Sequence, residues 1–169
     1  MAYGKIYRAG FSSKNQTGYV NIYKDGYSGS VTELTLIRDS VKWTYRPLQR
    51  EDPFIGLIAN FAILNNRADY LELLPLLTAE EREYFVEIEI ISPSSFLAFE
   101  GFLNSDVAEQ PYLKNRPIRL TASSYLSKLK NLDSVLVETL AEQTFIDIIL
   151  DCISLTGSTG NVYVNNSLV

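Results

Sequence analysis

Histidine is absent from this sequence, and cysteine, methionine and tryptophan occur once each. The missing histidine excludes the most common general base, proton shuttle and metal ligand of proteins, so neither a Ser-His-Asp nor a Cys-His site can be built. The single cysteine, Cys152, has no partner within the chain for a disulfide or a thiolate zinc site. We therefore expect no enzyme activity, no cofactor and no bound metal.

Long apolar segments are also scarce. The longest, residues 54–64, is interrupted by Asn60 and is far shorter than the roughly 20 residues of a membrane span. The first eight residues are polar and aromatic and contain no signal-peptide core. We expect a chain that acts in the cytoplasm, or leaves the cell within a larger assembly, without membrane contact.

The composition is that of a folded protein, with 169 residues of which 46% are hydrophobic and 21% charged. This length allows one domain, or one domain and a fragment. Residues 1–50 hold eight basic and three acidic side chains, whereas residues 51–100 hold two basic and ten acidic ones. This uneven distribution of charge suits identical subunits that dock head to tail in a ring, where opposite charges fix how neighbouring subunits align. Two differently charged solvated surfaces explain it equally well.

Segments rich in aromatic and β-branched residues predict a mainly β protein. Two hairpins are expected, one across a polar turn near the N-terminus and one across the turn at residues 92–95. The alternation of apolar and polar residues is clearest just before this second turn. The expected strands are residues 5–11, 18–23, 31–36, 41–45, 54–64, 84–91, 96–103 and 117–122. Residues 54–64 also fit a buried helix, but their Phe and Ile content and the flanking Pro53 favour a strand.

Helical patterns are few. Residues 78–81 predict a capped helical turn. Residues 145–155 predict a helix with only a thin polar stripe, which must be largely buried, and residues 161–165 predict a strand after it. We expect residues 1–133 to form a β-rich domain and residues 134–169 to begin a second subdomain. The expected class is α+β, mainly β, with one buried C-terminal helix.

Glu87 and Glu89 lie two residues apart on the clearest strand, so they share a face and lie about 7 Å apart. On spacing alone, such a pair fits the acid and base of a carboxylate-only glycosidase. The simpler interpretation, which we favour, is the polar face of a half-covered sheet. A third is an acidic face that lines a channel and repels a passing polyanion.

The N-terminal tyrosines and basic residues suit a subunit interface, because tyrosine combines an apolar ring with a polar tip. Packing within a sheet explains the tyrosines equally well. Sequence-specific nucleic-acid binding is disfavoured, because the basic segment is modest and its neighbour is acidic. The candidate interface residues are Tyr19, Tyr23, Arg38, Lys42, Trp43, Arg46 and Arg50.

Several short motifs follow one another along the chain in a recognisable order. They are Tyr19-Val20-Asn21-Ile22-Tyr23, Glu100-Gly101-Phe102-Leu103, Glu109-Gln110-Pro111-Tyr112, the segment 117–123 and a Thr-Gly pair after the expected helix. In these motifs the chain resembles the N-terminal part of bacteriophage tail hub proteins, particularly those of Bacteroidetes phages and prophages. It departs from them at Ser123-Ser124-Tyr125, where the family has Asp-Gly after Thr-Ala.

The resemblance implies an antiparallel β-barrel or sandwich related to the tail-tube fold. It implies a virion structural protein that assembles in the host cytoplasm as a homo-oligomeric ring, a trimer by analogy. Such a hub joins the tail tube and a distal tail protein to a central spike or fibre, and genomic DNA passes through it only as cargo. Glu87 and Glu89 would then line the lumen or an interface. The alternatives are a β-rich tail-tip module that binds a receptor or carbohydrate, and the glycosidase.

Overall fold

The computed structural model describes residues 2–13, 15–45, 56–65, 70–78, 80, 82–104 and 116–124. Within this part of the chain the protein consists mainly of strands, with one 3-10 turn, η1 (Tyr70–Leu73), and one short helix, α1 (Pro75–Thr78). The strands are β1 (Tyr3–Ser12), β2 (Thr17–Asp25), β3 (Thr32–Glu33), β4 (Thr35–Leu36), β5 (Lys42–Tyr45), β6 (Leu57–Leu64), β7 (Tyr84–Ser92), β8 (Phe96–Asn104) and β9 (Pro117–Ser123).

The strands form one sheet that nearly closes into a barrel. Neighbouring strands follow the order β3-β1-β2-β7-β8-β9-β6-β4, and β5 pairs with β6. All pairs are antiparallel except β1 with β3. Residues 32–36 pair with β1 through β3 and with β6 through β4, so this short segment joins the two ends of the sheet. Two hydrogen bonds reinforce it, from Leu34 N–H to Arg8 C=O and from Ile37 N–H to Ala62 C=O, both 2.8 Å.

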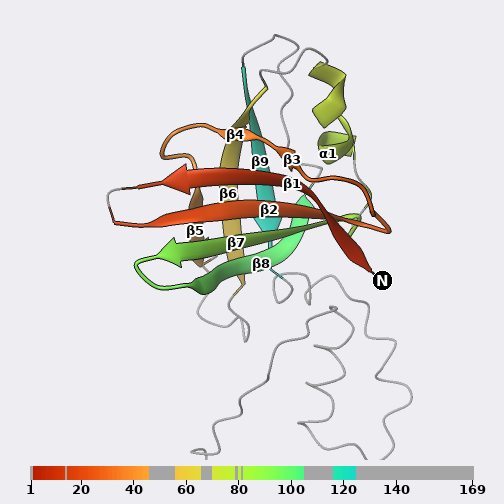
Figure 1. Cartoon of the computed structure of the whole chain (residues 1–169). Helices are drawn as coiled ribbons and strands as arrows, with labels where there is room; N and C mark the ends of the chain where they lie inside the picture. The colour runs from red at the N-terminus through yellow and green to blue at the C-terminus, as the bar shows by residue number, and fades with distance from the viewer. Residues whose placement is uncertain are drawn as a thin grey trace, which may run out of the picture.

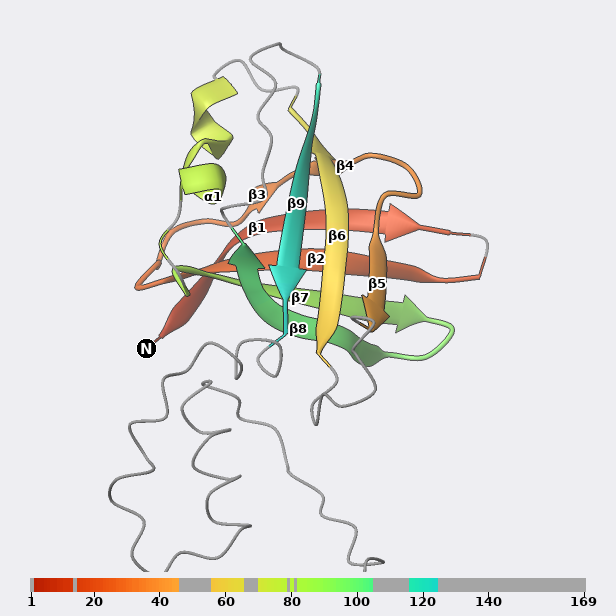
Figure 2. The same cartoon turned by 180° about the vertical axis from the view of Figure 1, so that it is seen from behind.

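Two layers of the barrel cross each other. Figure 1 shows β1, β2, β7 and most of β8 running side by side, with β9, β6 and β5 crossing behind them. Figure 2 shows the same crossing from the other side, with β9, β6 and β5 in front. β8 curves to belong to both layers, because it pairs with β7 up to Phe102 and with β9 from Phe102 onward. Gly101 lies at this bend, where a Cβ atom would approach the Ser123 carbonyl oxygen to 2.2 Å. Only glycine leaves room for the two backbones there.

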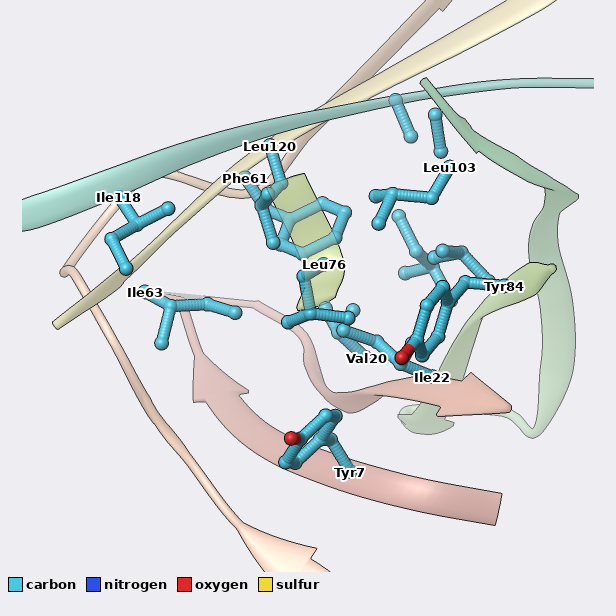
Figure 3. Close-up of a cluster of buried hydrophobic side chains, with 14 of the residues drawn as sticks. Tyr7, Val20, Ile22, Phe61, Ile63, Leu76, Tyr84, Leu103, Ile118 and Leu120 are labelled. Carbon is cyan, nitrogen blue, oxygen red and sulfur yellow. The ribbon is translucent and has the colours of Figure 1, made fainter. Parts of the chain in front are cut away.

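The hydrophobic core fills the space between the layers. On β7 the alternate residues Val86, Ile88 and Ile90 are fully buried, as a strand with one covered face requires. Each such side chain contributes about 1.5–3 kcal/mol relative to its exposed state. Side chains from both layers meet in Figure 3, among them Tyr7, Val20, Ile22, Phe61, Ile63, Tyr84, Leu103, Ile118 and Leu120.

The short helix α1 covers one end of the barrel (Figure 1). Pro75 suits the first helical position, where a backbone N–H has no helical partner. Leu73 and Leu76 are each 1% exposed and belong to the core. The predicted helical turn at residues 78–81 includes two positions, 79 and 81, that lie outside the described residues. The described helix ends at Thr78, where the prediction placed the start of the turn. Burial of the two leucines sets the position of the helix more strongly than the capping pattern does.

Most predicted strands are confirmed. Both hairpins are present, and the ambiguous segment 54–64 contains the strand β6. Segment 31–36 divides into β3 and β4, because its two halves pair with different strands on either side of Leu34. The predicted C-terminal helix at 145–155, the strand at 161–165 and the division after residue 133 lie outside the described residues.

Candidate functional site

Four of the predicted site residues share the outer face of the layer formed by β1, β2, β7 and β8. Val20 and Ile22 of β2 and Val86 and Ile88 of β7 point into the core. The alternate residues Tyr19, Tyr23, Glu87 and Glu89 therefore point outward. The register places Tyr19 directly opposite Glu89. We call the outward surface formed by these four residues and Glu100 of β8 the acidic face.

A short hydrogen bond joins two residues of the acidic face. The hydroxyl of Tyr23 donates to Oε2 of Glu87 at 2.5 Å. Burial raises the pKa of Tyr23 well above its usual value of 10.0, and the hydrogen bond and negative charge of Glu87 raise it further. The hydroxyl therefore remains a donor across the neutral pH range. On the same ring, Nζ of Lys5 lies 5.3 Å from the ring centroid.

Glu100 is a carboxylate that the sequence reasoning did not assign to the site. It is half-buried on β8 and lies directly opposite Glu87 in the β7–β8 register. Burial raises the pKa of Glu100, and repulsion from Glu87 raises it further. The sequence does not fix this pair, because a register shift between Ile88 and Glu89 changes the pairing on the way out from the turn at residues 92–95.

Two cations lie against aromatic rings of the acidic face, Lys5 on Tyr23 and Arg8 on Tyr19. The guanidinium carbon of Arg8 lies 3.4 Å from the centroid of the Tyr19 ring. β1 places Arg8 opposite Asn21, which is only 2% exposed although it lies on the outer side of the sheet. Within the described residues, neither Nε of Arg8 nor Oδ1 of Asn21 has a hydrogen-bond partner. The acidic face thus combines three carboxylates with two cations that lie against aromatic rings.

The remaining predicted interface residues lie elsewhere. Arg38 lies in the turn between β4 and β5, with its Nε 3.6 Å from Oδ2 of Asp39. Lys42 is exposed on β5, and Trp43 is half-buried against the core. Arg46 and Arg50 lie outside the described residues. The tyrosines therefore join the acidic face, whereas Arg38 and Lys42 belong to a separate part of the surface.

A groove lies beside the β4–β5 turn. Its volume is about 370 Å³. Phe11 and Trp43 supply aromatic walls, and Arg38 and Gln16 supply polar groups at its edge. The remaining lining residues are Gly10, Ser12, Ser13, Leu36, Ile37, Asp39 and Val41.

One carboxylate of the acidic face, that of Glu87, is bonded to strand β2. One oxygen of Glu87 accepts the hydrogen bond from Tyr23, and Glu89 lies opposite Tyr19. Within the described residues, no three side chains of the metal-ligating types come together. The same part of the chain contains no helix long and apolar enough to cross a membrane.

Comparison of the chain with protein-family models, with curated proteins and with solved structures finds no match.

Proposed function

We propose that this chain is a structural component of a bacteriophage tail tip, where its copies form a hub ring around the tail axis. The ring would join the tail tube and a distal tail protein to a central spike or fibre, and genomic DNA would pass through it during ejection. The observation that carries the proposal is a nearly closed β-barrel with an acidic outer face. The resemblance of the sequence motifs to hub proteins supports it. The proposed location is the virion tail, after assembly in the host cytoplasm.

The charge of the acidic face supports a role in lining the DNA passage. Duplex DNA carries one negative charge for about every 1.7 Å of its axis. Glu87, Glu89 and Glu100 present carboxylates on two adjacent strands, and such charges act over about 8 Å at physiological ionic strength. A wall of this kind repels phosphates and lets DNA slide, whereas a basic wall would bind it.

The internal contacts of the acidic face support a structural role. The Tyr23–Glu87 hydrogen bond and the stacking of Arg8 on Tyr19 hold four side chains in place on a continuous sheet. The ring of Tyr19 covers one side of the Arg8 guanidinium, which makes this cation less accessible to a passing phosphate. A fixed pattern of charge on a rigid sheet suits a surface repeated around a ring.

The assembly state tests the ring. The purified full chain, studied by light scattering after size-exclusion chromatography and by negative-stain electron microscopy, should form closed rings of identical copies with a central opening. We expect three copies, by analogy with the hub proteins. A monomer at every concentration, or an open filament, would contradict the proposal.

Charge reversal tests the role of the acidic face in the ring. The double variant Glu87→Lys/Glu89→Lys should bind a short fluorescent DNA duplex in an anisotropy titration, whereas the natural chain should not. The matched control is Glu33→Lys/Glu80→Lys, which changes the net charge equally at exposed positions on other segments. Equal DNA binding by both variants would contradict a lumen role. Hydrolysis of a bacterial polysaccharide that is lost in Glu89→Gln would instead support the glycosidase.

A further inference from the structure

The barrel is not closed along its whole length. Among the residues that the structure describes, β1 pairs with β3 at Tyr7 and Arg8 only, and beyond Arg8 it pairs with β2 alone. At the other end of the sheet, the chain turns through residues 37–40 between β4 and β5. The groove of about 370 Å³ lies between these two parts of the chain. We call this opening the seam.

The edge of β1 in the seam carries unused backbone groups. The carbonyl of Arg8 accepts a hydrogen bond from Leu34 N–H and therefore points away from β2. Because backbone groups alternate in direction along a strand, those of Gly10 and Ser12 point the same way. Within the described residues they have no hydrogen-bond partner on that side. Gly10 is exposed and has no side chain to cover the edge, so a further strand has access to it.

The side chains around the seam could bind a partner segment that has an apolar residue next to an acidic one. Phe11, Leu36 and Trp43 are packed partly against the core and also line the groove. The side chain of Arg38 is 92% exposed, and its ion pair with Asp39 is long at 3.6 Å. An exposed pair of this length holds a guanidinium weakly. Arg38 therefore remains able to bind a carboxylate from a partner.

The turn that carries Arg38 is fixed to β6. Oγ of Ser40 donates to Ile37 C=O at 2.6 Å and accepts from Ala62 N–H at 3.2 Å. Asp39 adopts a φ of 56°, in the left-handed region that short polar side chains tolerate. A wall held in this way is ordered before a ligand arrives, which lowers the entropy lost on binding.

We propose that the seam binds an extended peptide of a partner protein as an added strand along β1. The peptide backbone pairs with Gly10 and Ser12, an apolar side chain lies against Phe11 and Trp43, and an acidic side chain meets Arg38. The groove volume falls within the range of about 300–1,000 Å³ found for ligand sites. The proposed peptide contacts no residue of the acidic face, and its binding does not require the proposed ring.

The unused backbone groups favour a peptide over a compact ligand such as a sugar. Gly10 and Ser12 each present an N–H and a C=O, one strand repeat apart, and this pattern matches the backbone of an extended chain. Three residues of such a chain span about 10 Å. A compact ligand would fill the aromatic part of the groove and leave most of these groups unpaired.

The test is an NMR titration of the isotope-labelled full chain with a blocked peptide of about six residues that alternates valine and aspartate. The amide signals of Gly10 and Ser12 and the indole signal of Trp43 should shift. Lysine in place of aspartate in the peptide, or Arg38→Glu in the protein, should weaken binding by about three- to tenfold. The matched control Arg119→Glu, an equal charge change at an exposed position on β9, should leave binding unchanged.

A peptide methylated on its backbone nitrogens separates strand addition from side-chain binding. Methylation removes the backbone donors without changing the side chains, so it should abolish the shifts. Equal binding of the methylated peptide would overturn the added strand, and no shift at about 1 mM unmethylated peptide would overturn the site. Shifts of the same signals with N-acetylglucosamine but not with the peptide would identify a sugar site and also overturn the proposal.

Discussion

Replacing Gly101 by alanine should destabilise the barrel by far more than one added methyl group would on an open surface. Gly101 is buried on β8, where the strand passes from β7 to β9. The added Cβ would lie 2.2 Å from the carbonyl oxygen of Ser123 and 2.9 Å from the ring of Phe99. The first of these neighbours is backbone, so no side-chain rotation relieves the clash.

The size of the effect follows from the movement that the clash requires. Ordinary van der Waals contact begins at 3.4 Å, so a gap of 2.2 Å must widen by about 1.2 Å. Overpacking alone costs about 1–3 kcal/mol. In the described part of the chain, β8 and β9 pair over three residue pairs, beginning at Phe102 and Ser123. Each hydrogen bond lost there costs about 1 kcal/mol. We expect the free energy of unfolding to fall by about 3 kcal/mol and Tm by about 6–12 °C.

Urea unfolding followed by tryptophan fluorescence measures this loss. Trp43 is the only tryptophan and is half-buried on β5, so its emission reports on opening of the barrel. The matched control is Gly10→Ala, because a Cβ there meets only the ring of Tyr19 at 3.5 Å, an ordinary contact. The control should change stability by less than about 0.5 kcal/mol. A loss below about 1 kcal/mol for Gly101→Ala, or equal losses in the two variants, would refute the reasoning.

Two further predictions concern charge and packing. Glu100→Gln should stabilise the protein at neutral pH by about 0.2–1 kcal/mol, because Glu87 and Glu100 repel across the strands. Since the pKa of Glu100 is raised in the folded state, the natural chain loses stability as pH rises from the unfolded value of 4.5 through the folded pKa. The urea midpoints of the natural chain and of Glu100→Gln should therefore converge at about pH 4. A difference that stays constant between neutral pH and pH 4 would argue against a raised pKa of Glu100. Leu76→Ala should lower the free energy of unfolding by about 2–5 kcal/mol, because that side chain is 1% exposed. Leu77→Ala, at a half-buried position, should lower it less. Equal losses in the two variants would contradict the covering role of α1.

Local sequence patterns were sufficient to locate most of the strands. A strand with one covered face must alternate apolar and polar residues, whatever the rest of the chain does. Residues 84–91 show this, since Val86 and Ile88 are fully buried and Glu87 and Glu89 share the opposite face. The C-terminal helix and the second subdomain remain predictions from the same kind of pattern.

Pairing between distant segments was not predictable from such patterns. Leu34 divides one apparent strand into two because its N–H bonds to Arg8, a residue far back in the chain. The two strands on either side of it join opposite ends of the sheet. Likewise, the helical turn falls before residue 78 because Leu76 finds space in the core. A capping pattern reports local preference, and burial against remote strands overrides it.

The sequence by itself determined which residues share the polar face of each strand. It thereby placed Glu87 and Glu89 on one face of β7, and Tyr19 and Tyr23 on one face of β2. Only the tertiary structure decided that Glu100 lies opposite Glu87 and that Arg8 stacks on Tyr19. It also decided that the turn carrying Arg38 lies away from the acidic face, at the seam. The physical reason is that alternation along a strand is local, whereas register and barrel closure depend on hydrogen bonds between segments far apart in the chain.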